Sequence, residues 1–199
     1  MRYVASTNEK LADAVLEHKA FIAGVENSMF REVNKPLTEA RREVLDMISE
    51  AVQGSLNKYQ LDSLSARITA RLNIAKKEIT ESLHDKLVEV SQSEAKTFVS
   101  VMKRAMPKVL SDEVVGLDMD DDMTEELISE PVRGYTYERA VTVMIDKLSG
   151  KIEAIIKKAY SDTFKEMLDQ GNPLSSATGA ATDASKKLSA QIGNIRKVF

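Results

Sequence analysis

A stretch of 43 residues without proline or glycine, residues 62–104, constrains the fold of this chain more than any other feature. Its apolar residues recur at spacings of mostly three or four, which places them on one face of an α-helix and favours a nearly straight helix over a strict heptad coiled coil. At about 1.5 Å per residue this helix extends roughly 65 Å, well beyond the diameter of a compact monomer of this length. We therefore expect it to protrude, to bend or to be covered by another subunit. The predicted helix-packing interface consists of Leu64, Ile68, Leu72, Ile79, Leu83, Leu87, Val90, Phe98 and Val101.

Two shorter helices are expected ahead of the long one, and together they form a predicted N-terminal helical hairpin over residues 1–56. They span about residues 7–32 and 38–53. The segment Asn34-Lys35-Pro36 separates them, because proline cannot continue a helix without losing a hydrogen bond. Gly54 is a plausible C-terminal stop for the second helix. The apolar face of the first consists of Leu11, Val15, Ile22, Val25 and Met29, with His18 on the same stripe.

The remainder of the chain also has a helical pattern. Pro107 is expected to end the long helix, and a connector over residues 109–134 leads to a helix over about residues 137–170. Gly150 is expected either to kink that helix or to split it in two. The stop signal Gly171-Asn172-Pro173 closes it.

The last residues and the absence of strand patterns complete the expected fold. The small, polar residues 175–183 predict a linker, and a final short helix is expected over about residues 183–198. No segment shows sustained alternation of apolar and polar residues, so the sequence predicts an all-α, elongated helical bundle with little or no sheet. The expected domains after the hairpin are a long-helix core over residues 57–171 and a linker with a basic helix over residues 172–199.

Composition and motifs argue against several classes of protein. The absence of cysteine excludes disulfide scaffolds, thiolate metal sites and cysteine nucleophiles. No apolar run approaches the roughly 20 residues that span a bilayer, and the first residues have no apolar signal-peptide core, so we expect an unexported protein without membrane partners. Neither the phosphate-binding and dinucleotide-binding glycine motifs nor the nucleophile-elbow motif occurs. With two histidines in the chain, we predict a protein that is not an enzyme and holds no cofactor.

One acidic insert dominates the charge distribution. Residues 112–130 hold nine carboxylates and no lysine or arginine, whereas the whole chain has a formal net charge of -3. Asp118, Asp120 and Asp122 imitate the first ligands of a calcium-binding loop, but Met123 and Ser129 replace the glycine and glutamate that such a loop requires. We predict a solvated loop that docks electrostatically on a basic partner, or that repels DNA and sets the orientation of the helices; Asp122 or Thr124 is a candidate cap for a short helix within it. The candidate docking residues are Asp118, Asp120, Asp121, Asp122, Glu125 and Glu126.

Glu81 and His84 form the other pattern that resembles a metal site. A spacing of three places this carboxylate and imidazole on one helix face, as in di-iron helical bundles, which need a second such pair and two more carboxylates. The other histidine, His18, follows Val15 at that spacing rather than a glutamate. We therefore interpret Glu81 and His84 as a surface pair and predict no metal site.

The C-terminal residues 184–199 carry basic groups and no carboxylate side chain. Other lysine and arginine doublets in the chain lie near acidic residues, which is typical of a mixed solvated face. The C-terminal group has no such neighbours within its own stretch, so it is a candidate contact for DNA or for an acidic protein surface. Its members are Lys186, Lys187, Arg196 and Lys197.

The order of the helix-ending motifs resembles a viral protein family. Residues 83–193 are similar to the helical region that precedes the conserved domain of Mu-type phage minor head (head morphogenesis) proteins. An acidic-Ala pair is followed by an aromatic residue, then by an Ala-x-Pro stop, a Pro-x-x-Gly element, a helix ending in glycine and a last helix ending near Ile-Gly. The matching residues are Glu94, Ala95 and Phe98; Ala105 and Pro107; Pro131 and Gly134; Gly171; and Ile192 and Gly193.

The resemblance implies a virion structural protein that is made in the host cytoplasm. Such proteins associate with the portal or the inner capsid, in several copies on a ring, and influence head assembly, genome packaging or ejection, with DNA as a possible non-specific contact. Two departures matter: Gly171-Asn172-Pro173 stands where the family has a glycine-rich approach, and the family's conserved domain does not follow within this sequence. The activity of that domain is therefore not transferred to this chain.

Two other interpretations without catalysis remain open at the level of sequence. A scaffolding or other head-assembly protein shares the helical content, the high charge and the absence of cysteine. A cellular helical adaptor without a viral role shares them as well. Scaffolding proteins leave the mature particle, and an adaptor gene would not lie beside portal and capsid genes, so particle composition and genome neighbourhood separate the three. A further alternative, a carboxylate metal enzyme, would be removed by a metal analysis of the purified protein that comes back empty.

Overall fold

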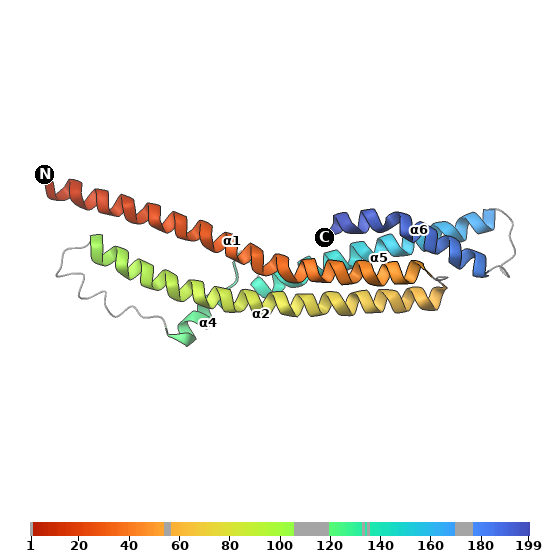
Figure 1. The fold of residues 1–199 in the computed structure, drawn as a ribbon. Coiled ribbons are helices and arrows are strands. Elements are labelled where there is room, and N and C mark those ends of the chain that lie inside the picture. Colours follow the sequence, from red (N-terminus) through yellow and green to blue (C-terminus); the bar gives the residue numbers. More distant parts are fainter. Residues whose placement is uncertain (1, 54–56, 106–119, 133, 135, 170–176) are drawn as a thin grey trace. The chain divides into compact units, whose positions relative to one another are not determined.

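The computed structural model describes residues 2–53, 57–105, 120–132, 134, 136–169 and 177–199. The side chains of residues 2–8, 10, 11, 102–105, 163–169 and 177–181 lie outside this description. These residues form five helices and no strand (Figure 1), which confirms the all-α helical bundle expected from the sequence. The chain divides into two compact units. Unit 1 contains residues 1–33 and 80–137, and unit 2 contains residues 34–79 and 138–199. The helices α1 and α2 contribute to both.

Helix α1 is one continuous helix, Arg2–Val52, with Pro36 inside it. The predicted break at Asn34-Lys35-Pro36, and with it the hairpin over residues 1–56, is wrong. A proline inside a helix costs about 3 kcal/mol, but α1 packs against the same partner helix on both sides of Pro36. Glu32 contacts Ser82 of α2 in unit 1, and Glu43 contacts Arg71 of α2 in unit 2. Continuous packing along α2 therefore outweighs the local penalty.

Helix α2, Lys58–Ala105, is the long helix that the sequence predicts, and it begins four residues earlier than expected. Asn57 and Gln60 explain the earlier start. The Gln60 backbone N–H donates to Asn57 Oδ1 at 2.9 Å, and the Asn57 backbone N–H donates to Gln60 Oε1 at 2.8 Å. This reciprocal arrangement is a capping box built from amides, and it satisfies N–H groups that a helix start leaves without partners. The predicted stop at Pro107 lies outside the described residues.

Helix α4, Asp121–Ser129, lies in the acidic insert. Its N-cap is Asp120, whose side chain accepts a hydrogen bond from the Met123 backbone N–H at 2.8 Å. The predicted caps Asp122 and Thr124 are therefore wrong. Thr124 instead lies inside the helix and is buried, with its hydroxyl donating to the Asp120 carbonyl oxygen at 2.9 Å. The described part of the insert is thus helical rather than a calcium-binding loop.

Helices α5, Tyr137–Asp169, and α6, Ala177–Val198, complete the chain. Gly150 does not split α5, which runs unbroken through it. The predicted stop over residues 171–173 lies outside the described residues. The predicted linker over residues 175–183 is wrong from Ala177 onward, because α6 begins there. Its first turns are rich in alanine, the residue with the highest helix propensity, and small side chains were mistaken for a linker.

Unit 2 is a four-helix bundle built from the second part of α1, the first part of α2, α5 and α6. The helices α1 and α2 run in opposite directions, as do α5 and α6 (Figure 1). All four segments contribute fully buried side chains to one apolar core, including Ile48, Leu72, Ile152 and Leu188. Because Leu188 and Ile195 of α6 belong to this core, the unit boundaries cut across the expected domain limits near residues 56 and 171.

Unit 1 consists of the first part of α1, the second part of α2, and α4. Among its described side chains, the buried apolar ones are Ala14, Leu83 and Ile128, whereas the other buried apolar side chains of the described chain lie in unit 2. Polar contacts instead join the two long helices. His18 Nε2 lies 3.3 Å from Glu94 Oε1, and the Ser82 hydroxyl donates to Glu32 Oε2 at 2.6 Å. Unit 1 therefore has a small core with polar groups between its helices.

Candidate functional site

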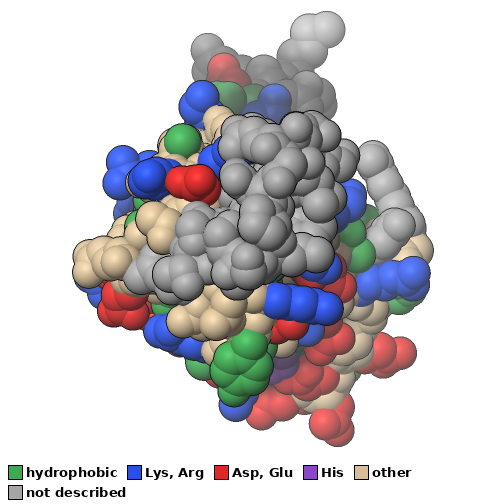
Figure 2. Space-filling model, turned by 90° about the vertical axis from the view of Figure 1, so that its right-hand side faces the viewer, with side chains coloured by type: hydrophobic (Ala, Val, Ile, Leu, Met, Phe, Trp, Pro, Cys, Tyr) green, Lys and Arg blue, Asp and Glu red, His purple; other side chains and the backbone are tan. Residues whose placement is uncertain are grey.

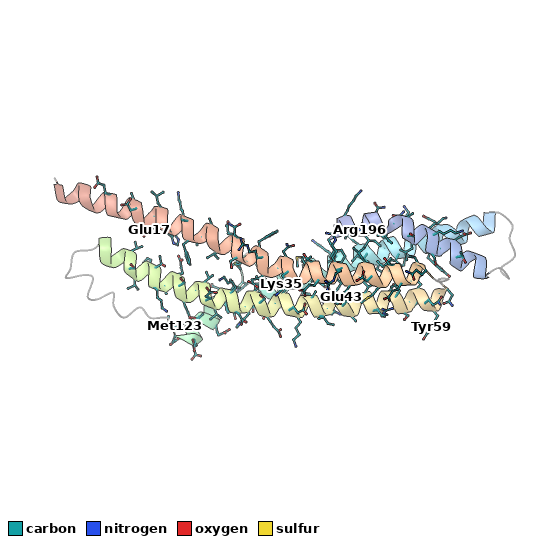
Figure 3. The ribbon with its side chains drawn as sticks, in the orientation of Figure 1. Glu17, Lys35, Glu43, Tyr59, Met123 and Arg196 are labelled. Carbon is teal, nitrogen blue, oxygen red and sulfur yellow. The ribbon has the colours of Figure 1, made fainter. Side chains whose placement is uncertain are left out.

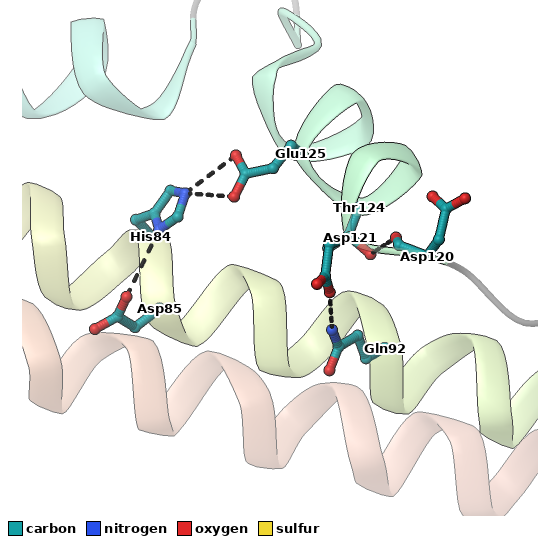
Figure 4. A network of polar contacts seen from close by, with 7 residues as sticks. All are labelled: His84, Asp85, Gln92, Asp120, Asp121, Thr124 and Glu125. Atoms are coloured by element: carbon teal, nitrogen blue, oxygen red, sulfur yellow. Dashed lines mark hydrogen bonds and ion pairs between the residues drawn. The ribbon is translucent and has the colours of Figure 1, made fainter.

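The acidic helix α4 docks on α2 through polar contacts made by Asp121 and Glu125 (Figure 4). Thr124 and Ile128 are four residues apart on one face of α4, and both are buried. His84 Nε2 of α2 lies 3.1 Å from Glu125 Oε1, and Gln92 Nε2 donates to Asp121 Oδ1 at 3.5 Å. Two charged groups of the insert are therefore used within the chain, where they fix α4 to α2.

His84 is the titratable group at the centre of this contact. Its pKa is raised above the ordinary value of 6.5, mainly because Glu125 accepts a hydrogen bond from the protonated ring and secondarily because Asp85 adds negative charge. His84 Nδ1 lies 3.6 Å from Asp85 Oδ1, and the ring of Tyr137 lies 6.3 Å away from the imidazole ring. The cation favoured by these carboxylates strengthens the contact between α2 and α4.

The docking of α4 is therefore expected to depend on pH. A group with a raised pKa in the folded state contributes its full stability below the unfolded pKa of about 6.5 and loses it as the pH rises through the folded value. Hydrogen-exchange protection of the α4 amides, corrected for intrinsic rates, should be higher at pH 5.5 than at pH 8. The effect should be small, because an exposed ion pair contributes about 1 kcal/mol at most. His84→Gln should remove the difference, and a pH dependence that survives this substitution would contradict the assignment.

The carboxylates of the insert fall into two groups. Asp120, Asp121 and Glu125 are engaged in the capping and docking contacts of α4. Asp122, Glu126 and Glu130 are exposed, and their carboxylates make no hydrogen bond or ion pair within the part of the chain that the structure describes. Met123 and Leu127 lie beside them and are half exposed. Asp118 lies outside the described residues. The outward face of α4 is thus acidic with an apolar pair, and its docking on a basic partner stays a prediction.

The basic residues of α6 are less isolated than the sequence suggests. Lys186 Nζ lies 3.4 Å from Asp183 Oδ1, a carboxylate one residue before the carboxylate-free stretch 184–199. Lys187 lines a shallow hollow between α5 and α6, together with Asp162. Arg196 and Lys197 are exposed in the last turn of α6 (Figure 3). On the face drawn in Figure 2, acidic side chains gather in one area and basic ones are scattered.

The predicted helix-packing interface divides between the two units. Leu64, Ile68, Leu72, Ile79 and Leu83 are buried within this one chain. Leu87, Val90 and Val101, in unit 1, are only partly buried, and Phe98 is 53% exposed. The part of the stripe from Leu64 to Ile79 is therefore buried in the bundle of unit 2, and Leu83 is buried in unit 1. The second half of the stripe retains apolar surface that the described chain does not cover.

Sequence reasoning missed a buried charge in unit 2. Arg71 is 7% exposed, and its Nε donates to Glu43 Oε2 at 2.7 Å, with Nη1 lying 3.7 Å from Glu78 Oε2. Glu43 points from α1 toward α2 (Figure 3). The available signal was an arginine within the apolar stripe between Ile68 and Leu72, a position where a charge requires a partner.

The histidines and carboxylates do not converge on a metal site in the described part of the chain. His84 contacts Asp85 and Glu125 rather than Glu81, and His18 contacts Glu94. Within the residues described, no group of three or more potential ligands is arranged to hold a metal ion. Likewise, no helix in this part has the length and apolar character needed to cross a membrane.

Comparison with known proteins adds no relative to this picture. No family model, no curated protein and no solved structure matches the chain.

Proposed function

We propose that this protein is a non-enzymatic structural protein of a phage head, a minor head protein that associates with the portal or the inner capsid. The phage setting rests on the resemblance of residues 83–193 to Mu-type minor head proteins. The proposed mode of action, docking of helices on other protein chains, rests on the exposed apolar residues of unit 1. In this proposal the protein is assembled in the host cytoplasm, becomes part of the virion and contributes to head assembly, genome packaging or ejection.

The unequal packing of the two units carries the proposal. Unit 2 has a closed apolar core, whereas the described side chains of unit 1 include most of the exposed large apolar residues. Uncovered apolar surface of this kind marks sites of protein association. Unit 2 would then be the independently packed body and unit 1 the docking part. The exposed apolar residues of unit 1 are Val15, Leu16, Ile22 and Phe30 on α1, Phe98 on α2, Met123 and Leu127 on α4, and Val132.

A matched pair of aromatic substitutions tests the docking role. Phe98 lies in unit 1 and Tyr59 in unit 2, and both are exposed. When the chain is co-expressed with the portal and major capsid proteins of the same genome, as the proposal requires, it should co-sediment with portal rings or capsid shells. Phe98→Ser should reduce that co-sedimentation by about tenfold or more, because truncating an aromatic anchor of an interface costs about 2 kcal/mol or more and about 1.4 kcal/mol corresponds to tenfold in Kd. Tyr59→Ser should leave it unchanged. Equal behaviour of the two variants, or no co-sedimentation of the unsubstituted chain, would contradict the proposal.

A further inference from the structure

The outward face of α1 in unit 1 carries a second apolar stripe. A helix turns by about 100° per residue, so the residues that face α2, among them Ala14, His18 and Val25, lie on one side. The exposed apolar residues lie roughly 130° away, within an arc of about 120°. Nothing in the described chain covers them; Phe30, for example, is 69% exposed. The second stripe consists of Ala12, Val15, Leu16, Ile22, Ala23 and Phe30, and Val33 ends it half-buried.

Two charges of opposite sign interrupt this stripe. Between Ala12 and Val33, Lys19 and Glu26 are the charged residues that helical geometry places on the outward face. They are seven residues apart, too far for an ion pair within one helix. Both side chains are exposed, and neither makes an ion pair within the described part of the chain. A partner that covers the stripe must therefore supply one carboxylate and one cation at the same spacing.

We propose that the partner is a second copy of this chain, paired through α1 in antiparallel orientation. If Lys19 meets the partner's Glu26, two-fold symmetry makes Glu26 meet the partner's Lys19. The axis then passes between Ile22 and Ala23. In the same register Val15 meets the partner's Phe30, and Ala12 meets the partner's Val33. In this register apolar residues meet apolar residues and each charge meets the opposite charge, so the stripe is complementary to itself.

The charges also select the orientation. In a parallel pair in register, each Lys19 would face the partner's Lys19 and each Glu26 the partner's Glu26. Like charges would then meet near the middle of the stripe, where the partner covers them, which is unfavourable. The antiparallel pair converts both contacts into attraction. The face spans about 33 Å, or roughly three heptads, a length that supports a moderate rather than a tight association. This pairing goes beyond the docking on capsid proteins proposed above. It assigns the exposed apolar residues of α1 to a second copy of the chain and leaves those of α2 and α4, Phe98 among them, to the capsid partner.

Charge reversal tests the pairing in the full chain. Sedimentation equilibrium at low salt should show a reversible dimer of the unsubstituted chain. Lys19→Glu and Glu26→Lys, each alone, should raise the dissociation constant by about tenfold or more, because each creates two like-charge contacts. The double variant Lys19→Glu with Glu26→Lys should restore it to within about threefold. Arg31→Glu is the matched control: it reverses an exposed charge of α1 that lies off the stripe, and it should change nothing.

Two alanines on the stripe report the orientation directly, because the chain contains no cysteine. Ala23 lies next to the proposed two-fold axis, so Ala23→Cys should form an intermolecular disulfide under mild oxidation. Ala12→Cys should not, because the two copies of this position would lie about 30 Å apart. Circular dichroism of each variant checks that the helices are retained. A monomer at all concentrations, single charge reversals without effect, or equal cross-linking at both positions would overturn the proposal.

Discussion

Replacing Ile68 with alanine should lower the free energy of unfolding by about 2–5 kcal/mol, the loss expected when a buried isoleucine leaves a cavity. Ile68 is 3% exposed and belongs to the bundle core of unit 2. Ile74 lies on the same helix and in the same unit but is 53% exposed. Ile74→Ala should therefore change the free energy of unfolding by no more than about 0.5 kcal/mol. Urea denaturation followed by circular dichroism measures both variants.

This pair of variants decides what covers the apolar stripe of α2. If the stripe in unit 2 is packed within one chain, the loss at Ile68 appears in dilute solution and does not depend on protein concentration. If another subunit covers it, the loss at Ile68 would be small in the monomer or would vary with concentration. Equal losses at Ile68 and Ile74 would contradict the described burial.

The second large effect is expected at the buried Arg71. Glu43→Ala removes the carboxylate that accepts from Arg71 Nε and leaves a buried guanidinium beside the more distant Glu78. The expected loss is about 1–3 kcal/mol, reduced from the fully buried case because the Glu43 side chain is itself 42% exposed. Glu50→Ala is the matched control, because Glu50 pairs with Arg67 at 3.6 Å on the surface. That control should cost less than about 1 kcal/mol.

Removing the arginine instead should be better tolerated. Arg71→Met replaces the buried cation with an apolar side chain of similar length and leaves Glu43 and Glu78, whose side chains are 42% and 43% exposed. A partly exposed carboxylate without a partner costs less than a buried guanidinium without one, so the loss of unfolding free energy should be smaller than for Glu43→Ala. A larger loss of unfolding free energy for Arg71→Met than for Glu43→Ala would show that the ion pair adds net stability, and does not merely compensate for a buried guanidinium.

The long helix α2 was predictable from sequence because its signals are local. The absence of proline and glycine over residues 62–104 and the regular apolar spacing together predict one helix. The break at Pro36 was predicted wrongly because its penalty is local, whereas the packing that overrides it involves α2, far along the sequence. The alanine-rich start of α6 was misread for a similar reason: small side chains suit both linkers and helices.

The acidic insert was predictable in composition but not in role. Its charge is plain in the sequence, yet the division between carboxylates that hold α4 on α2 and carboxylates that face outward depends on where α4 docks. Glu125 reaches His84 across 41 positions in the chain, a contact that spacing rules within one helix cannot anticipate. The pairing of Lys186 with Asp183 was missed because the basic stretch was counted from residue 184.

The unequal packing of units 1 and 2 appears only when burial is known. Along the sequence, the apolar stripe of α2 continues with similar spacing from Leu64 to Val101. In the structure its first half is buried in unit 2, and Phe98 in its second half is exposed. The same periodicity therefore serves an internal core in one unit and available surface in the other.

Composition analysis of purified particles tests the central claim most directly. In the proposed setting, heads would be produced from the genome that carries this gene, and empty proheads and DNA-filled heads would be separated and quantified by mass spectrometry. A minor head protein should be present in DNA-filled heads at a fixed ratio to the portal protein. Its presence in proheads and loss from filled heads would indicate a scaffolding role, and its absence from both would contradict the assignment to the phage head.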